Sequence, residues 1–404
     1  MPGTSFGSAA WREWTAQAPA PPTPAGVGPA ARHLTAGGAP STLRLGGVEL
    51  PVLGRARVYV CGITPYDTTH LGHAATFVWA DMAARVLRLT GAEVEVCRNI
   101  TDVDDELLRQ ASADRVAWRS LASQQTYRFE QDMADLGVTR PMHEPRAYDY
   151  VDDVIRLAAA LLATGAAYER NGSVFFRQRG VAERAGLSRE QALALASERG
   201  GRPEDPDKDD PLDAALWLRS VATEPGWESP WGRGRPGWHA ECTAMALATL
   251  GPSIDIHAGG ADLSFPHHAF EAAQAEAFTG VAPFARAWMH VGTVMMDGRK
   301  MAKSTGNLVF VHDLLERWPA GALRLLILSR PWADPWDFRA EDLDAAAERL
   351  EHLWQHGSRR STESAAAEVA GALLDDLDVR RALDVASDSG GQVLRDLVAL
   401  LGLR

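Results

Sequence analysis

Residues 61–73 read CGITPYDTTHLGH and decide the fold of this chain. The residues that lead into them, 57–61, favour a strand, and the glycine, proline and aspartate that follow predict a turn. An apolar pattern with helical spacing then covers residues 70–87. Because the first N–H groups and the positive dipole end of a helix attract phosphate, we expect a nucleotide here, with His70 and His73 donating to it. The alternative is an ordinary strand–helix turn with two solvated histidines.

The composition is that of a globular protein of two or three domains. The chain has 404 residues, of which 46% are apolar and 23% charged. Its net charge of −12 argues against a dedicated nucleic-acid binder, whose surface should be basic. Three cysteines are too few for a disulfide framework, so we expect a reduced, cytoplasmic location. No apolar run approaches the roughly 18 residues of a membrane span, and the start of the chain does not predict a signal peptide.

The order of the predicted elements indicates an α/β protein. Residues 1–40 are rich in proline, alanine and glycine and predict a flexible tail. Strand and helix patterns alternate over residues 43–110, which favours a parallel sheet with right-handed crossovers. The charged stretch 197–211, SERGGRPEDPDKDDP, predicts a loop, and residues 314–328 predict a helix. Residues 365–404 are amphipathic and predict a small helical bundle.

Four separate stretches carry polar groups that a core would not favour. Residues 99–105, NITDVDD, follow a predicted strand; helix capping is the alternative explanation for their aspartates. Residues 234–242, GRPGWHAEC, form a turn that leads into a helix, and residues 259–268, GGADLSFPHH, follow another predicted strand. Residues 297–307, DGRKMAKSTGN, present cations, hydroxyls and a glycine that suit a polyphosphate, although a solvated basic loop is also consistent with them.

Four side chains from these stretches form a candidate zinc set. Cys61, Cys242, His267 and Glu271 offer two thiolates, an imidazole and a carboxylate, which are all accepted zinc ligands. His267 and Glu271 are four residues apart, so a helix would place them on one face. The spacing is dispersed, and a cysteine on an apolar element is often a small core residue. Metal binding and ordinary packing therefore both remain open at this point.

Two signatures resemble those of class I aminoacyl-tRNA synthetases. His70–His73, HLGH, resembles the HIGH motif, and Lys300–Ser304, KMAKS, resembles the KMSKS loop. Together with NITDVDD, GRPGWHAEC and DLSFPHH, in this order, they resemble the cysteinyl-tRNA synthetase family in particular, over about residues 44–340.

This resemblance implies a domain organisation. It implies a class I synthetase-like Rossmann (HUP) catalytic domain over residues 41–340, with a connective insertion at about 165–235. A short C-terminal helical bundle over residues 341–404 would follow.

The same resemblance implies the cofactors and the site residues. It implies ATP with Mg²⁺, with His70, His73, Lys300 and Lys303 as catalytic residues. One zinc ion per chain would bind at Cys61, Cys242 and His267, with Glu271 as a possible fourth ligand. The residues that it places around the amino acid and its adenylate are Thr64, Thr76, Asn99, Thr101, Trp238, Gly260, Asp262, Val294 and Ser304. Packing and capping are the alternative roles for Trp238 and Thr101.

The family has two branches, the synthetases and the cysteine ligases of mycothiol biosynthesis, which join cysteine to the amine of glucosaminyl-inositol. Residues 63–67 read ITPYD where the synthetases usually have PTVYD, and the stretches 197–211 and 232–236 also resemble the ligases. The region after Phe338 is short and partly acidic. We therefore expect ATP, L-cysteine and glucosaminyl-inositol as partners of a monomer that uses neither tRNA nor a membrane.

The chain departs from both branches at four alanines. Ala302 replaces the middle serine of KMSKS, Ala258 and Ala261 stand in the usual GGGSD run, and Ala269 replaces a glutamate. The alternatives to a cysteine:glucosaminyl-inositol ligase are a cysteinyl-tRNA synthetase, a diverged paralogue that uses another amine, and a nucleotide-binding paralogue without turnover.

Overall fold

The computed structural model describes residues 34, 42–66, 69–221, 224–301, 306–356 and 363–403. The predicted tail lies outside the described residues except for Leu34, which is buried. Lys303 and Ser304, with Ala302 beside them, also lie outside.

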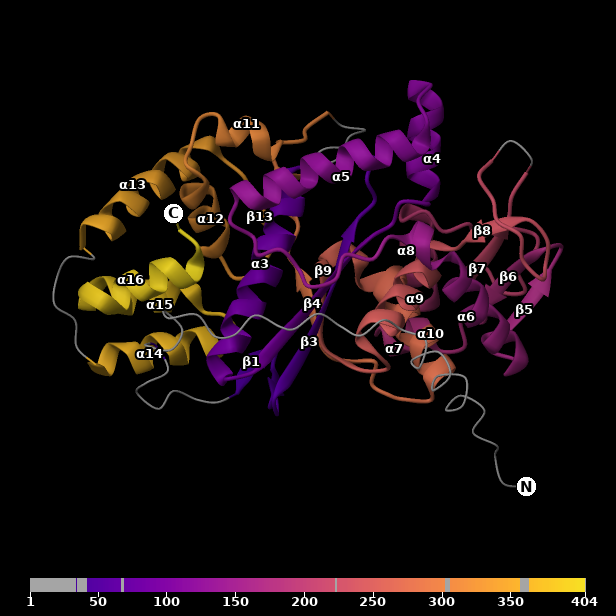
Figure 1. Ribbon diagram of the computed structural model, residues 1–404, viewed down its shortest axis with the longest axis horizontal. Coiled ribbons are helices and arrows are strands. Elements are labelled where there is room, and N and C mark those ends of the chain that lie inside the picture. Colours follow the sequence, from indigo (N-terminus) through magenta and orange to yellow (C-terminus); the bar gives the residue numbers. More distant parts are fainter. Residues whose placement is uncertain are drawn as a thin grey trace.

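A four-stranded parallel sheet forms the centre of the molecule (Figure 1). Its strands are hydrogen-bonded in the order β10-β9-β3-β4. Their bounds are β3 (Arg55–Ile63), β4 (Glu93–Ile100), β9 (Ile254–Gly260) and β10 (Ala285–Val291). The predicted α/β class with a parallel sheet is confirmed.

Helices cover both faces of this sheet because side chains alternate along its buried strands. Val58 and Val60 of β3 pack in one hydrophobic cluster with helix α3 (Leu71–Leu87). Tyr59 and Cys61 point to the opposite face, where they pack in a second cluster with α9 (Trp238–Leu250). Helices α6 (Val151–Ala163) and α10 (Ala269–Thr279) contribute to the same cluster.

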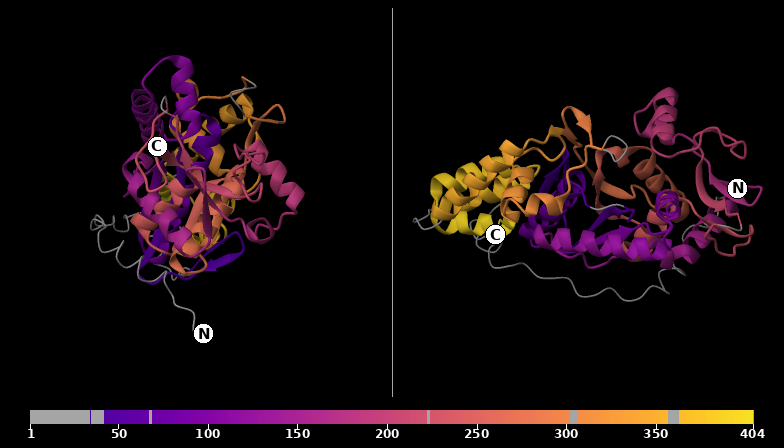
Figure 2. Two further views of the ribbon diagram at one scale, coloured as in Figure 1. Left: turned by 90° about the vertical axis from the view of Figure 1, so that its right-hand side faces the viewer. Right: turned by 90° about the horizontal axis from the view of Figure 1, so that it is seen from above.

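A smaller antiparallel sheet lies beside the central one (Figure 2). It consists of β5 (Ala167–Arg170), β6 (Ser173–Phe176), β7 (Ala214–Arg219) and β8 (Gly234–Pro236). Helices α7 (Val181–Arg184) and α8 (Arg189–Glu198) connect β6 to β7, and a loop over 199–213 follows α8. Two consecutive helices, α4 (Asp105–Asp114) and α5 (Trp118–Asp135), follow β4.

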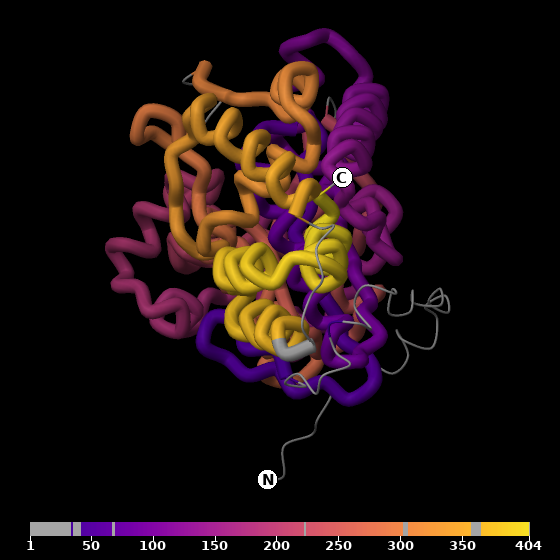
Figure 3. The backbone as a smooth tube through the Cα atoms, turned by 90° about the vertical axis from the view of Figure 1, so that its left-hand side faces the viewer, coloured from indigo at the N-terminus to yellow at the C-terminus, as the bar shows by residue number. Residues whose placement is uncertain are grey.

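The C-terminal part is helical and packs on the side of α3 away from the antiparallel sheet (Figures 1 and 3). Its helices are α11 (Val311–Leu315), α12 (Ala320–Leu328), α13 (Ala340–His356), α14 (Glu363–Leu374), α15 (Val379–Ser389) and α16 (Gly391–Leu401). The prediction of one helix over 314–328 is wrong. Pro319, with an extended ψ of 144°, separates α11 from α12 because proline restricts the residue before it and cannot donate a helical hydrogen bond.

Short elements complete the chain. The hairpin β1 (Leu43–Leu45) and β2 (Val48–Leu50) precedes the central sheet. The strands β11 (Val294–Met296), β12 (Arg299–Lys300) and β13 (Trp336–Asp337) form a small sheet after β10. A search of the described residues finds no helix with the length and apolar character that crossing a bilayer demands.

A buried cation joins α3 to the C-terminal helices. The Arg324 side chain of α12 is fully buried and forms an ion pair with Asp81 of α3. It also donates to the carbonyl oxygens of Leu401, at the end of α16, and of Leu136, just after α5. Burial opposes ionisation, yet Arg324 and Arg85 hold the pKa of Asp81 below its usual value.

Replacing Asp81 should therefore destabilise the fold strongly. Asp81→Ala leaves Arg324 buried without its counter-ion, which should lower the free energy of unfolding by ~3–5 kcal/mol. Asp384→Ala is the matched control, because that exposed carboxylate also pairs with an arginine, Arg349, and should cost no more than ~1 kcal/mol. Urea unfolding measures both. Equal losses in the two variants would contradict a structural role for the Asp81–Arg324 pair.

Candidate active site

One cavity of about 1480 Å³ lies at the carboxyl edge of the central sheet. The strand β3 and the start of α3 form one wall, and the segments after β4, β8 and β9 form the others. Most of the side chains predicted to act on substrates line this single cavity. They are Cys61, Thr64, His70, His73, Thr76, Asn99, Thr101, Trp238, Cys242, Gly260, Asp262, His267, Val294 and Lys300.

The turn between β3 and α3 has the geometry of a helix N-terminus. His70 is the N-cap residue, and its Nδ1 accepts a hydrogen bond of 3.1 Å from the backbone N–H of Gly72. The rings of His70 and His73 stack with centroids 3.8 Å apart. Burial lowers the pKa of His73 to about 4, so its ring is neutral near pH 7. This turn offers helix N–H groups and the neutral imidazole of His73, both of which can donate to an anion.

Glycine is required where β3 approaches β4. A Cβ atom on Gly62 would come within 1.6 Å of the carbonyl oxygen of Asn99. The Asn99 side chain, which lines the cavity, bridges β3 to α9. Its Oδ1 accepts from the backbone N–H of Gly62 at 3.0 Å, and its Nδ2 donates to the Cys242 thiol at 3.3 Å. Thr64 and Thr101 form a 2.8 Å hydrogen bond between their hydroxyls next to it.

The four predicted zinc donors converge although they come from distant parts of the chain. The ligand atoms of Cys61, Cys242, His267 and Glu271 all lie within 4.8 Å of one another, and all four side chains are buried. The i, i+4 relation holds, because His267 Nε2 lies 2.8 Å from the Glu271 carboxylate. Glu271 does not line the cavity and stands behind the other three donors.

The charge balance of this donor set favours a cation. Burial penalises a charged imidazole, but the Glu271 carboxylate and the Cys242 thiol raise the pKa of His267 to about 10. Burial also opposes the charge on Glu271, yet His267 and His257 hold its pKa well below the usual value. In the metal-free protein a protonated His267 balances the negative charge of these donors. A metal ion would supply that positive charge instead, because metals and protons compete for the same lone pairs.

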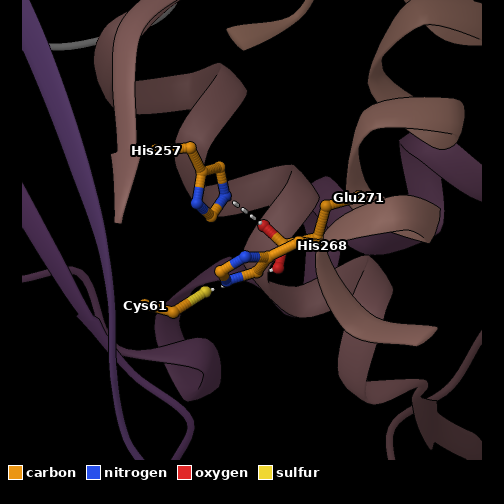
Figure 4. A group of neighbouring side chains, drawn as sticks. All are labelled: Cys61, His257, His268 and Glu271. Atoms are coloured by element: carbon orange, nitrogen blue, oxygen red, sulfur yellow. Dashed lines mark hydrogen bonds and ion pairs between the residues drawn. The ribbon is translucent and has the colours of Figure 1, made fainter. Parts of the chain in front are cut away.

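Sequence reasoning missed the histidines that surround these donors. The second carboxylate oxygen of Glu271 lies 2.9 Å from His257 Nε2 (Figure 4), so this carboxylate contacts the ring of His257 as well as that of His267. A second set of potential ligands shares Cys61 and Glu271 with the first and adds His257 and His268 (Figure 4). His239 contacts His267 at 2.8 Å between their Nδ1 atoms. The position of His257 within a predicted buried strand was the one available signal, because a core strand seldom carries an imidazole without a partner.

A charged pair also lines this cavity. Lys300 Nζ lies 2.7 Å from an Asp262 oxygen, and Lys300 lowers the pKa of Asp262 although burial opposes this. The ring of Trp238 stacks on that of His267 with centroids 4.0 Å apart. Lys303 and Ser304, which the sequence assigns to the same loop as Lys300, are outside the described residues.

A helix N-terminus and a set of potential metal ligands share one cavity at the carboxyl edge of a parallel sheet, which is where α/β enzymes bind their substrates. The family model for the tRNA synthetases class I (C) catalytic domain matches residues 50–348, and the chain belongs to this family.

Curated relatives carry two names. The L-cysteine:1D-myo-inositol 2-amino-2-deoxy-alpha-D-glucopyranoside ligase of Corynebacterium aurimucosum is 43% identical, covering 86% of this chain and 91% of that protein. The ligase of the same name from Streptomyces griseus is 42% identical over 92% of this chain and 94% of its own. The cysteine–tRNA ligase of Rhodospirillum rubrum is 42% identical over 85% of this chain and 75% of its own. The resemblance to the cysteine-ligase branch is confirmed, and the chain is an enzyme of the ligase class.

Solved structures agree on the fold. A methionyl-tRNA synthetase of Mycobacterium tuberculosis in complex with methionyl-adenylate superposes with a TM-score of 0.60 at 15% identity, covering 87% of this chain and 82% of that one. A leucyl-tRNA synthetase from Agrobacterium radiobacter K84 gives 0.62 at 10% identity, with coverage of 88% and 84%. At these identities the likeness establishes the fold alone.

The depressed pKa of His73 can be tested directly. Nitrogen-detected NMR of the ligand-free protein should show the His73 ring neutral down to a pH of about 4, because burial disfavours its charged form. Adding ATP should raise this pKa, since phosphate charge favours the imidazolium. His73→Asn identifies the resonance. A midpoint near 6.5 in the free protein would contradict the buried geometry of this ring.

Proposed function

We propose that this enzyme joins L-cysteine, through a cysteinyl-adenylate, to the amine of glucosaminyl-inositol and releases AMP and pyrophosphate. The observation that carries the proposal is the single cavity shared by the His70–His73 turn and the donor set at Cys61, Cys242 and His267. A nucleotide and a thiol amino acid bound at these two places would lie next to each other. The acceptor in this proposal is the one in the names of the Corynebacterium and Streptomyces ligases, which are similar to this chain over most of their length.

The first step is adenylation. A carboxylate oxygen of cysteine attacks the α-phosphorus of ATP, the bond to the β-phosphate oxygen breaks, and pyrophosphate leaves. His70 and His73 would donate to phosphate oxygens, and Lys300 and Lys303 would neutralise the leaving group together with Mg²⁺ carried by ATP. Such a reaction needs positioning and charge stabilisation more than covalent help from the protein. Lys300 would exchange its partner Asp262 for phosphate, because its ion pair already lies at the cavity wall.

The donor set fits zinc in number and chemistry. Two thiols, an imidazole and a carboxylate are common zinc ligands, and the raised pKa of His267 reflects the pull of this set on a positive charge. Bound zinc would supply a Lewis acid for which a thiolate is a far better ligand than a hydroxyl. Around it, the stacked Trp238 ring would orient His267 and close the cysteine pocket. The other residues that we propose to contact cysteine and its adenylate are Thr64, Thr76, Asn99, Thr101, Gly260, Val294 and Ser304.

The second step is amide formation. The neutral amine of the acceptor attacks the carbonyl carbon of the adenylate, the carbon–oxygen bond to AMP breaks, and the nitrogen loses a proton to solvent. An amine is a better nucleophile than a ribose hydroxyl, so this step needs no strong general base from the protein.

A cysteinyl-tRNA synthetase is the second candidate, and the 42% identity to the Rhodospirillum rubrum enzyme favours it. The charge of the cavity argues for the ligase. Acidic side chains outnumber basic ones among the described residues that line it, and a polyanion such as tRNA normally requires the reverse.

The metal should be present in the purified protein. Elemental analysis without chelators should find about one zinc per chain, and Cys242→Ala or His267→Ala should remove most of it, because each deletes a buried donor. Cys97→Ala is the matched control, since Cys97 is equally buried but belongs to neither donor set. No zinc in a wild-type protein that still activates cysteine would refute this assignment.

The acceptor should be the amino-sugar. With ATP and cysteine alone, the protein should exchange pyrophosphate into ATP, and serine should be poorer by orders of magnitude. Mass spectrometry of parallel reactions should then show the cysteinyl amide with glucosaminyl-inositol and negligible charging of tRNA. Charging of tRNA without amide would favour the synthetase, and no exchange at all would favour a paralogue without turnover.

A further inference from the structure

The cavity extends well past the two places assigned to ATP and cysteine. Pockets for a ligand of ordinary size occupy roughly 300–1,000 Å³. The cavity here has about 1480 Å³, and its lining runs on from Trp238 to the start of α4 and to the loop after α8. We call this extension the α4 arm and define it by Asp105, Arg202, Lys208, Glu224 and Arg235. All five line the cavity.

The wall of the α4 arm is a fixed network of opposite charges. Asp105, the first residue of α4, accepts from Arg235 Nε at 2.7 Å and from Arg202 at 3.0 Å. Arg235 also donates to Glu224 at 3.0 Å, and its side chain is only 7% exposed. These pairs join α4, which follows the central sheet, to the segments around the antiparallel sheet. The network places charged donors and acceptors next to one another on this wall, around the buried guanidinium of Arg235.

Two polar groups at the arm lack partners. The amine of Lys208 makes no hydrogen bond or ion pair with any residue that the structure describes, although the side chain is half-buried in the wall. At the inner end, beside Cys242, Glu241 is 1% exposed and its Oε2 has no hydrogen-bond partner within the described part of the chain. Buried polar atoms without partners are uncommon, so the Glu241 oxygen in the cavity wall points to a ligand that supplies the missing bond, and the half-buried Lys208 amine is a second donor available to that ligand.

We infer that the α4 arm binds the acceptor, a neutral or cationic polyhydroxylated amine. This inference rests on the proposed function and adds the location of the second substrate. Alternating carboxylates and guanidinium groups suit vicinal hydroxyls, because each hydroxyl both donates and accepts. The arm opens onto Trp238 and Cys242, so an amine held there faces the carbonyl carbon of an adenylate whose thiol lies at the metal donors.

The test separates the two substrates with single variants. Arg202→Ala and Lys208→Met each remove one donor from the arm. The KM for glucosaminyl-inositol in amide formation should rise about tenfold or more, as expected for losing a hydrogen bond to a charged group. Pyrophosphate exchange with cysteine alone should stay within about twofold of wild type, because neither residue contacts the nucleotide turn. Arg184→Ala is the matched control: Arg184 and Arg202 are both 54% exposed and ion-paired, but Arg184 does not line the cavity.

The outcomes are distinct. An unchanged acceptor KM in both variants, with amide formation intact, overturns the assignment. A parallel fall of pyrophosphate exchange overturns it as well, since the residues would then serve adenylation or folding. If the wild-type protein exchanges pyrophosphate but forms no amide with the amino-sugar, the proposed function itself fails and the assignment fails with it.

Discussion

The parallel pairing of β3 with β4 on one side and β9 on the other constrains everything else in this molecule. Parallel strands end at the same edge of a sheet, so the segments that follow them meet there. Cys61 and Asn99 come from the ends of β3 and β4, and Asp262 and His267 follow β9. The cavity exists because these chain reversals gather at one edge, and Gly62 allows the backbones to approach closely enough for it to form.

Within that cavity one carboxylate organises the buried charges. Glu271 meets His267 through one oxygen and His257 through the other, while Cys61 donates to it at 3.3 Å. A buried carboxylate without such partners would be too costly to keep ionised. The same arrangement leaves Cys242 and His267 facing the cavity and keeps Glu271 behind them. The donor set is therefore supported from the side that substrates do not reach.

The sequence predicted local patterns better than long-range arrangements. The strand at residues 57–61 and the helix after His70 follow from patterns within a few residues, and the structure contains both. The prediction of one helix over 314–328 is wrong because the apolar spacing continues across Pro319, although proline cannot continue the helical hydrogen bonding. The four donors could be named from their residue types, but only the family resemblance favoured metal binding over ordinary packing. No local pattern shows that His239 or His257 packs against them, or that Arg235 reaches Asp105, since these contacts exist only once the sheet has formed.

The buried Arg324 side chain connects the C-terminal helices to α3, which packs on the central sheet. It holds α12, α3 and the end of α16 through one guanidinium group, and Arg85 of α3 donates to the Leu400 carbonyl beside it. Helix α3 and the last helix of the chain are thus held together through one buried group. An opening that breaks the Arg324 contacts frees α3 and α16 together, so a ligand bound at the start of α3 would also slow amide exchange in α16, at the far end of the chain.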